Sequence, residues 1–233
     1  MTSVPTASVG LLAAEGAPNP WFDADYVRDN AQAISFAVQE HVYLTWTSVL
    51  AGLVIAVPLA LVARHRPRLE GPILGVEGVL YTIPALALFA MLQPLLGLSA
   101  LVVQIGLTTY TLLVLSRNTL TGLRGVPADV LEAARGLGLG PVRTFLRVEL
   151  PLALPAIVAG LRIATVSTIS LVTVGGLFGY GGLGTLIYQG YNTNLYRAQI
   201  MTATVLCVVL AVVAELLLYG AQRAVTPWAR RGR

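Results

Sequence analysis

The chain has 233 residues and a formal net charge of +4, with 56% hydrophobic and only 11% charged residues. Soluble globular domains carry about 25% charged residues, so this composition excludes an ordinary water-soluble domain, a disordered tail and a disulfide scaffold, and it indicates a membrane protein. All 15 basic residues are arginine and Cys207 is the single cysteine, which excludes the phosphate-binding lysine of an ATPase, Schiff-base chemistry and a multi-cysteine metal site.

Residues 1–44 precede the first long apolar stretch and are expected to lie outside the cytoplasm. They contain no basic region followed by a sustained apolar run, so a cleaved signal peptide is not expected. Between residues 23 and 41, apolar side chains such as Tyr26 and Phe36 stand among acids and amides. This pattern predicts an amphipathic helix at the outer membrane surface. A solvated tail with weak helicity is the alternative.

Five apolar stretches are long enough to cross a bilayer core of about 30 Å, which takes about 20 residues in a helix. They are residues 45–63, 73–92, 98–115, 152–171 and 200–219. The glycine-rich segment 172–190 is only partly apolar, and we interpret it as the end of the fourth span followed by a re-entrant or surface loop. A sixth span there is the alternative. The predicted fold is an all-α membrane protein with one transmembrane domain over residues 45–220.

Arginine is distributed unevenly over the segments between these spans. Twelve arginines fall after the first span, after the third span and in the tail, against Arg28 and Arg197 on the opposite face. The twelve are Arg64, Arg66, Arg68, Arg117, Arg124, Arg135, Arg143, Arg147, Arg223, Arg230, Arg231 and Arg233. Positively charged loops stay in the cytoplasm, so the N-terminus is expected outside and the C-terminus inside, which five spans satisfy and six do not. The basic tail 221–233 would then lie close to anionic membrane lipid.

The longest polar interval, residues 116–149, is predicted to be a cytoplasmic loop that carries a short helix. Pro127 suits the first helical turn, and an acid such as Glu132 favours the positive end of a helix dipole. Gly136 or Gly138 can end the helix. A helix of about nine residues is not stable alone in water, so it must pack against a partner.

A spaced motif lies within this loop: Glu-Ala-Ala, three residues, a glycine, nine residues, and then Val-Glu-Leu-Pro. It resembles the EAA signature of membrane subunits of ATP-binding-cassette (ABC) importers, with Val148 at a position where isoleucine is usual. Further segments are similar to the permease subunits of osmoprotectant importers. They are residues 40–45, 81–87, 116–123, 151–162 and 179–184. Tyr180 departs from the resemblance, because alanine is usual there.

This resemblance implies the all-helical MetI-like fold of type I importers and a role as half of a translocation pore in the bacterial inner membrane. The solute would be glycine betaine, carnitine, choline or proline betaine. The implied partners are cytoplasmic ATPase subunits, a second permease copy or a paralogue, and an extracytoplasmic solute-binding protein, with no nucleic acid. This chain would hold no cofactor and catalyse no reaction, since ATP and Mg²⁺ would bind to the partner ATPase. The residues that would couple to the ATPase are Val130, Leu131, Glu132, Ala133, Ala134, Arg135, Gly136 and Gly138, with Val148, Leu150 and Pro151 at the loop exit.

Two other functions stay open at this point. An ABC permease for another small solute, such as an amino acid, would share the same motif. A passive channel or a scaffold subunit would also explain the hydrophobicity and the uneven arginines, but it would not explain the spaced motif.

Polar residues within the predicted spans are candidates for a solute path. They are Gln104, Thr108, Thr165, Thr168 and Thr173, which would either line the path or form hydrogen bonds between helices. Arg162 lies within the fourth span, where a charged side chain costs about 2.5–3.5 kcal/mol on insertion scales. It therefore needs a partner, and the predicted one is Glu215 in the fifth span.

Tyr180, Tyr188 and Tyr191 cluster, together with Tyr196, at the predicted outer end of the fourth span and in the loop after it. Aromatic rings bind quaternary ammonium groups through cation–π attraction, so these side chains would suit the outer mouth of a betaine pore. Tyrosines also form belts at the membrane interface, and we favour that interpretation.

Overall fold

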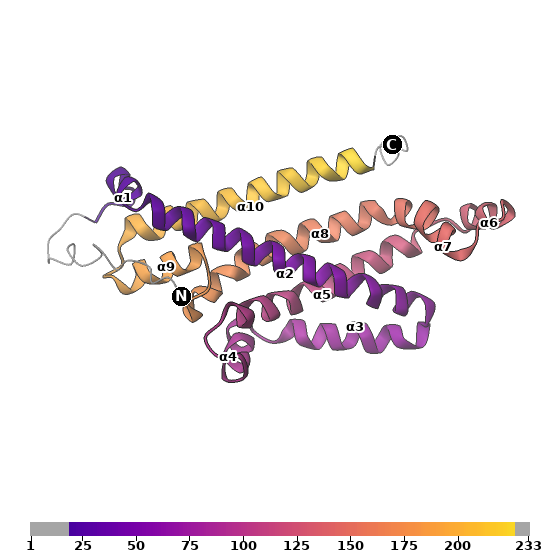
Figure 1. The fold of residues 1–233 in the computed structure, drawn as a ribbon, viewed down its shortest axis with the longest axis horizontal. Coiled ribbons are helices and arrows are strands. Elements are labelled where there is room, and N and C mark those ends of the chain that lie inside the picture. Colours follow the sequence, from indigo (N-terminus) through magenta and orange to yellow (C-terminus); the bar gives the residue numbers. More distant parts are fainter. Residues whose placement is uncertain (1–18, 227–233) are drawn as a thin grey trace.

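The computed structural model describes residues 19–226, and over this range the chain forms helices and no strands (Figure 1). In chain order the α-helices are α1 (Ala24–Asp29), α2 (Ala31–His65), α3 (Pro67–Thr82), α4 (Ala85–Leu96), α5 (Ala100–Arg124), α6 (Ala128–Gly136), α7 (Pro141–Thr144), α8 (Leu150–Val172), α9 (Leu183–Asn192) and α10 (Arg197–Val225). A π-helical turn, η1 (Phe145–Glu149), joins α7 to α8, and a 3₁₀ helix, η2 (Thr173–Phe178), follows α8. The predicted all-α fold is confirmed. Three arginines of the predicted basic tail, Arg230, Arg231 and Arg233, lie outside the described residues.

Four stretches within residues 19–226 are long and apolar enough to cross a membrane: α2, α5, the run from α7 to η2, and α10. Helices α3 and α4 pass the same test as a pair bent by 95°, which makes a fifth span if the pair counts as one. The prediction of about five spans agrees with this count. Helix α9 has 10 residues and is about 15 Å long, roughly half of a bilayer core, so it does not form the sixth span considered from the sequence.

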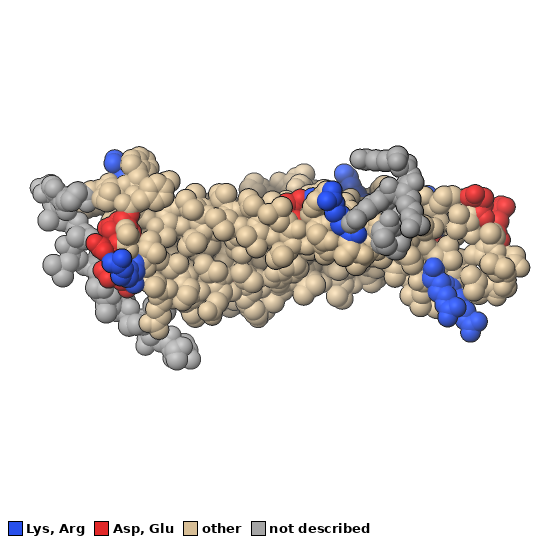
Figure 2. All heavy atoms as spheres, turned by 90° about the horizontal axis from the view of Figure 1, so that it is seen from above, with Lys and Arg blue, Asp and Glu red and all other residues tan. Residues whose placement is uncertain are grey.

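The spans form an elongated bundle with two distinct ends (Figure 1). Helices α1 and α9 lie at one end, which we name the α9 end, while α6, α7 and the turn between α2 and α3 lie at the other, the α6 end. On the face drawn in Figure 2, charged side chains lie at both ends and also near the middle of the bundle, and the band between the α9 end and this middle group shows none. A band without exposed charges is what the hydrocarbon core of a bilayer requires.

Helix α5 packs between α2 and α8 and forms the centre of the bundle. Small residues let helices approach closely, as is common in membranes. A Cβ atom on Gly122 of α5 would lie 2.8 Å from the carbonyl oxygen of Ala153 on α8. A Cβ atom on Gly160 of α8 would lie 2.9 Å from the Cγ of Asn118 on α5. Larger side chains at these glycines would therefore push α5 and α8 apart.

The predicted second span, residues 73–92, is wrong as a single helix, because the chain bends between α3 and α4. Ile83 is extended at this bend, since the residue before a proline is disfavoured in the helical region. Pro84 itself has no N–H group with which to continue a helix. The hydroxyl of Tyr110 on α5 donates a hydrogen bond to the carbonyl oxygen of Ile83. A polar side chain of the central helix α5 thus satisfies a carbonyl group at the break between α3 and α4.

The N-terminal region also differs from the predicted surface helix over residues 23–41. Only α1 is separate, whereas residues 31–41 are the first turns of α2, which has 35 residues and is about 52 Å long. Helix α2 therefore extends beyond a bilayer core of about 30 Å. Asp23 caps α1 by accepting a hydrogen bond from the N–H of Asp25 (2.9 Å), so α1 begins as an independent helix.

The residues before α2 contact the loop between α9 and α10 through hydrogen bonds and one aromatic pair. The side chain of Asn19 donates to the carbonyl oxygen of Leu195 (3.0 Å) and accepts from the N–H of Arg197 (2.9 Å). The ring of Tyr26 packs edge-on against Tyr196, with 5.3 Å between the ring centres. Burial raises the pKa of Tyr26 to about 12, so its phenol stays neutral at physiological pH. These contacts fix the N-terminal segment to the α9 end.

The glycine-rich segment forms a tight turn between η2 and α9 instead of a span. Gly179 (φ +80°) and Gly182 (φ +52°) have left-handed backbone conformations that favour glycine. A Cβ atom on Gly182 would lie 2.6 Å from the Cβ of His41 on α2. The N–H of Gly182 donates to the carboxylate of Glu40 (3.2 Å), and the Nε2 of His41 donates to the carbonyl oxygen of Ile169 on α8 (3.0 Å). Two adjacent side chains of α2 thus hold this turn and the end of α8.

An ion pair within the predicted spans attaches α10 to α8. Arg162 donates to both carboxylate oxygens of Glu215, which confirms the predicted pairing, and also donates to the side-chain oxygen of Gln222 (2.7 Å). Gln222 in turn donates to the carbonyl oxygen of Pro155 (3.0 Å). The guanidinium carbon of Arg162 lies 4.9 Å from the centre of the Tyr219 ring, where a cation–π attraction contributes. The charge of Arg162 is therefore neutralised between these two helices.

Replacing Arg162 with glutamine is expected to destabilise the chain, because Glu215 is left charged without its partner. An unpaired charge at the centre of a membrane helix costs up to about 2.5–3.5 kcal/mol on insertion scales. The free energy of unfolding in detergent micelles measures the effect. The double variant Arg162→Gln with Glu215→Gln is the control, since it removes both charges, and it should be more stable than Arg162→Gln alone. Equal stability of the two variants would contradict the pairing.

Candidate functional site

The predicted coupling helix is present as α6, which has nine residues. It projects at the α6 end, beyond the ends of α5 and α8 (Figure 1). Pro127 precedes the helix instead of occupying its first turn, because its ψ of 140° is extended. Helix α5 continues to Arg124, so the loop expected from residue 116 begins about two helical turns later. The buried side chain of Val126 anchors the chain where it leaves α5.

The geometry at the end of α6 explains the glycine of the spaced motif. The N–H of Gly138 donates to the carbonyl oxygen of Arg135 (2.9 Å). The N–H of Leu139 donates to the carbonyl oxygen of Ala134 (3.1 Å). These two bonds form a Schellman motif, which places a left-handed residue, usually glycine, after the helix, and Gly138 has a φ of +75°. Of the two glycines considered from the sequence, Gly138 ends the helix, while Gly136 is its last helical residue.

Helix α6 is buried along one side only. Ala134 is buried, and Val130 and Leu131 are half-buried. The remaining predicted coupling residues are exposed, namely Glu132, Ala133, Arg135, Gly136 and Gly138. The acid and the first alanine of the motif therefore face outward, where a partner can reach them.

Apolar side chains beside α6 are also exposed, and the sequence analysis did not identify them. Leu137 is 81% exposed, Val142 70% and Leu146 54%. Their signal in the sequence is only that they are large apolar residues within a polar interval. The three residues lie within ten positions of one another in the chain, and large apolar side chains exposed to water are suited to contact with another protein or a membrane. Together with the exposed side of α6, they form the candidate docking surface.

The loop exit joins this docking surface to the membrane helix α8. After α7 the chain passes through η1, a π-helical turn of a kind often found at functional sites, and continues directly into α8. Val148, Leu150 and Pro151 are half-buried at this junction. Pro151 stands in the first turn of α8, where a missing N–H group is tolerated. Helical structure is therefore continuous from α7 to the middle of the membrane domain.

Two ion pairs tie membrane helices together at the α6 end. Arg64 of α2 pairs with Glu149 of η1, and their side chains are only 18% and 16% exposed. Arg124 at the end of α5 donates two hydrogen bonds to Glu70 of α3. Neither pair was predicted from the sequence, because each depends on how helices distant in the chain pack. The first pair connects the loop exit directly to α2.

Two of the polar residues predicted for a solute path form hydrogen bonds between helices. The side-chain amide of Gln104 donates to the hydroxyl of Thr47 (2.9 Å), and the hydroxyl of Thr108 donates to the carbonyl oxygen of Ser48 (3.4 Å). Both bonds link α5 to α2. These bonds are of the interhelical kind that was one of the two roles considered from the sequence.

The three predicted threonines bond to backbone carbonyl oxygens one turn earlier in their own helical segment. Thr165, Thr168 and Thr173 each do so with their hydroxyl groups. Thr165 and Thr168 are at most 1% exposed, so in this conformation they face the interior of the bundle and do not line a path. A buried acid, Glu77 of α3, accepts a hydrogen bond from the hydroxyl of Ser116 on α5 (2.7 Å) and adds a further link between helices.

The three predicted outer-mouth tyrosines do not form one aromatic cluster. Tyr180 donates to the carbonyl oxygen of Leu98 (3.3 Å) and packs toward α4 and α5. Tyr188 and Tyr191 lie on α9 and are 42% and 64% exposed. Among residues 19–226, no ring contact joins any two of the three. The described part of this chain therefore assembles no aromatic cage for a quaternary amine at these positions.

Known proteins are similar to this chain over most of its sequence. Residues 48–231 match the family described as "Binding-protein-dependent transport system inner membrane component". The chain is 36% identical to the choline transport system permease protein OpuBB of Bacillus subtilis, over 87% of this chain and 93% of that protein. It is 33% identical to the glycine betaine/carnitine/choline permease protein OpuCB of the same organism, over 89% and 95%. It is 36% identical to the osmoprotectant import permease protein OsmW of Salmonella typhimurium, over 87% and 96%.

The backbone is similar to that of a solved transporter as well. A chain of the MetNI methionine ABC transporter in an inward-facing conformation matches with a TM-score of 0.76 and 26% identity, over 85% of this chain and 98% of that chain. The predicted fold of a type I importer permease is therefore confirmed. The chain belongs to the family of binding-protein-dependent transport system inner membrane components and is a multi-pass permease subunit of the inner membrane.

Proposed function

We propose that the chain is half of the translocation pore of an ABC importer, completed by a second permease copy or a paralogue. The α6 end would face the cytoplasm and bind an ATPase subunit, which holds ATP and Mg²⁺ and performs the hydrolysis. The observation that carries this proposal is α6 itself, a nine-residue helix that is exposed on the side of Glu132 and bordered by exposed apolar side chains. Such a helix needs a partner to be stable in water. The arginines at this end support the same orientation.

The continuous helical path into α8 supports a mechanical role. When the two ATPase subunits close, they would displace α6, and α7 and η1 would carry the displacement to α8. The ion pair between Glu149 and Arg64 would transmit it to α2, because both side chains are largely shielded from water. The pore would change between inward-open and outward-open packing as a population shift driven by the ATPase. No covalent step takes place in this chain.

The solute that we propose is a small quaternary amine such as glycine betaine, carnitine, choline or proline betaine. Support comes from the relatives, whose names describe permeases for choline, for glycine betaine and carnitine, and for osmoprotectants. An extracytoplasmic binding protein would deliver the solute to the α9 end. It would also hold most of the specificity, since the tyrosines at that end do not form a cage. The likeness to a methionine transporter favours an amino acid as the second candidate.

Uptake into proteoliposomes distinguishes the two solutes. The permease, reconstituted with its ATPase and its binding protein, is expected to concentrate radiolabelled glycine betaine or choline only when ATP is supplied. Excess methionine should leave this uptake unchanged, and excess carnitine should compete with it. Competition by methionine would contradict the proposed solute, and accumulation without the ATPase would contradict the importer.

The charge reversal Glu132→Arg tests α6 as the docking site for the ATPase. It is expected to lower ATP-dependent uptake and ATPase retention by at least about tenfold, equivalent to about 1.4 kcal/mol of binding free energy. Glu132 is exposed, so membrane insertion should be preserved. Asp29→Arg is the matched control, because it makes the same charge change at an exposed residue of α1, and it should keep the ATPase bound. Full ATPase retention by Glu132→Arg would count against this role of α6.

The substitution Gly138→Ala tests the Schellman motif at the end of α6. No atom lies within 4 Å of a Cβ placed on Gly138 or on Gly136, so crowding affects neither variant. At a φ of +75° alanine costs about 1–2 kcal/mol, whereas in the helix at Gly136 alanine is favoured. Amide hydrogen exchange over residues 134–139 should therefore become faster in Gly138→Ala and not in Gly136→Ala.

Asparagine provides a rescue at the same position, since it tolerates the left-handed conformation better than alanine does. Gly138→Asn should restore most of the protection from exchange and most of the uptake. If exchange in Gly138→Ala matches that of the unmodified chain, the end of α6 does not depend on this glycine.

A further inference from the structure

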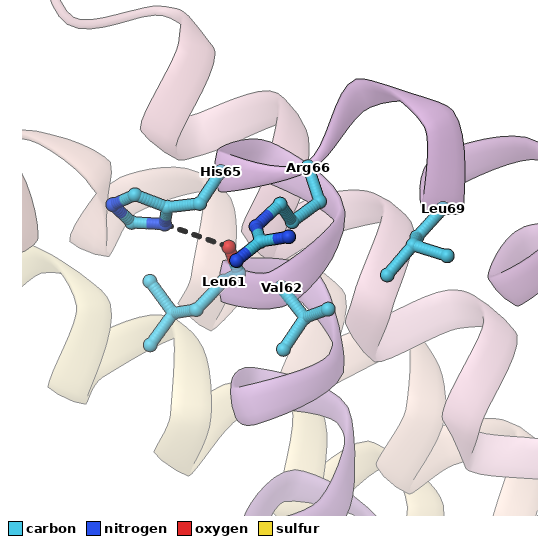
Figure 3. A pocket seen from close by; sticks show the side chains of 5 residues that line it. All are labelled: Leu61, Val62, His65, Arg66 and Leu69. Atoms are coloured by element: carbon cyan, nitrogen blue, oxygen red, sulfur yellow. Dashed lines mark hydrogen bonds between the residues drawn. The ribbon is translucent and has the colours of Figure 1, made fainter.

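A pocket of about 410 Å³ opens on the surface beside the turn between α2 and α3. It is an open depression on the surface and not an enclosed cavity. It is lined by Leu61, Val62, His65, Arg66 and Leu69. Figure 3 shows His65 and Arg66 above the side chains of Leu61 and Val62, with Leu69 across from them. The pocket therefore has an apolar part and a basic part.

The position of the pocket along α2 places these two parts at different depths in a membrane. Leu61 and Val62 belong to the last turn of the apolar stretch 45–63. His65 and Arg66 follow directly, where α2 ends and the chain turns into α3. The apolar side chains thus stand at the level of the acyl chains, and the basic side chains stand at the level of the lipid headgroups.

Arg66 lines the pocket, which Arg68 does not, and neither of the two has an acidic partner among the residues that the structure describes. Arg64 pairs with Glu149, and Arg124 pairs with Glu70. The guanidinium group of Arg66 instead lies over the apolar side chains of the pocket (Figure 3). A cation at the edge of the hydrocarbon core attracts an anion, and a headgroup of the membrane itself is the nearest source.

We propose that this pocket binds one anionic phospholipid, with its phosphate against Arg66 and an acyl chain along Leu61, Val62 and Leu69. The Nδ1 of His65 donates to the carbonyl oxygen of Leu61 (2.8 Å), which fixes the imidazole ring at the rim of the pocket. A free phosphate ion would use only the basic part, whereas burial of the apolar part favours an occupant with an alkyl chain. This site is independent of which solute is carried, since it depends only on membrane insertion.

Native mass spectrometry of the permease–ATPase complex, released from nanodiscs with equal amounts of phosphatidylglycerol and phosphatidylcholine, tests the proposal. The complex should retain phosphatidylglycerol in preference. Arg66→Gln should weaken this binding about fivefold, equivalent to about 1 kcal/mol for one arginine near the membrane surface. Arg68→Gln is the matched control, because Arg68 is an exposed arginine two residues further along that does not line the pocket. It should leave the binding unchanged.

A second variant, Val62→Phe, fills the apolar part and leaves both basic side chains in place. It should also weaken the binding of phosphatidylglycerol, and millimolar inorganic phosphate should not displace the lipid. Equal losses in Arg66→Gln and Arg68→Gln would overturn the proposal in favour of diffuse charge attraction. Displacement by inorganic phosphate would overturn it in favour of a free-anion site. The absence of any preference for phosphatidylglycerol in the unmodified complex would overturn it outright.

Discussion

Inside a bilayer there is no water to satisfy the backbone, so every N–H and C=O group must find a partner within the protein. The chain meets this constraint with long helices, and side chains compensate where the helices stop. At the bend between α3 and α4, the hydroxyl of Tyr110 bonds the carbonyl oxygen of Ile83. At the turn after η2, the carboxylate of Glu40 accepts a hydrogen bond from the N–H of Gly182. Because these side chains come from α5 and α2, the irregular segments depend on the central helices.

The same lack of water governs the charges of the membrane domain. Arg162 is neutralised by Glu215 on α10, and at the α6 end Arg64 is neutralised by Glu149. Each pair joins elements that are far apart in the sequence. Electrostatic contacts therefore stabilise the arrangement of the helices together with apolar packing. Contacts of this kind depend on geometry and change when helices shift. They therefore suit a permease that alternates between two packed states.

Much of this architecture could be predicted because it follows from local composition. Hydropathy located the spans, since insertion depends on the apolar side chains of each stretch. Helix α6 could be predicted because the signals for its start and its end, from Pro127 to Gly138, lie within a dozen residues of the sequence. The partner of Arg162 could be predicted because few acidic residues lie within the predicted spans, and Glu215 is one of them.

The tertiary structure alone decided the features that depend on packing between distant helices. A proline in an apolar stretch is compatible with a kink or with a break, and the structure shows a break of 95° whose free carbonyl oxygen is bonded by α5. Thr165 lies in the interior of the bundle in this conformation, because α8 turns that side toward its neighbours. The pairing of Arg64 with Glu149 requires two helix ends to meet at one end of the bundle. The sequence by itself determined which segments enter the membrane, since that is a property of each segment; only the folded bundle determines which side chains meet, since that is a property of pairs.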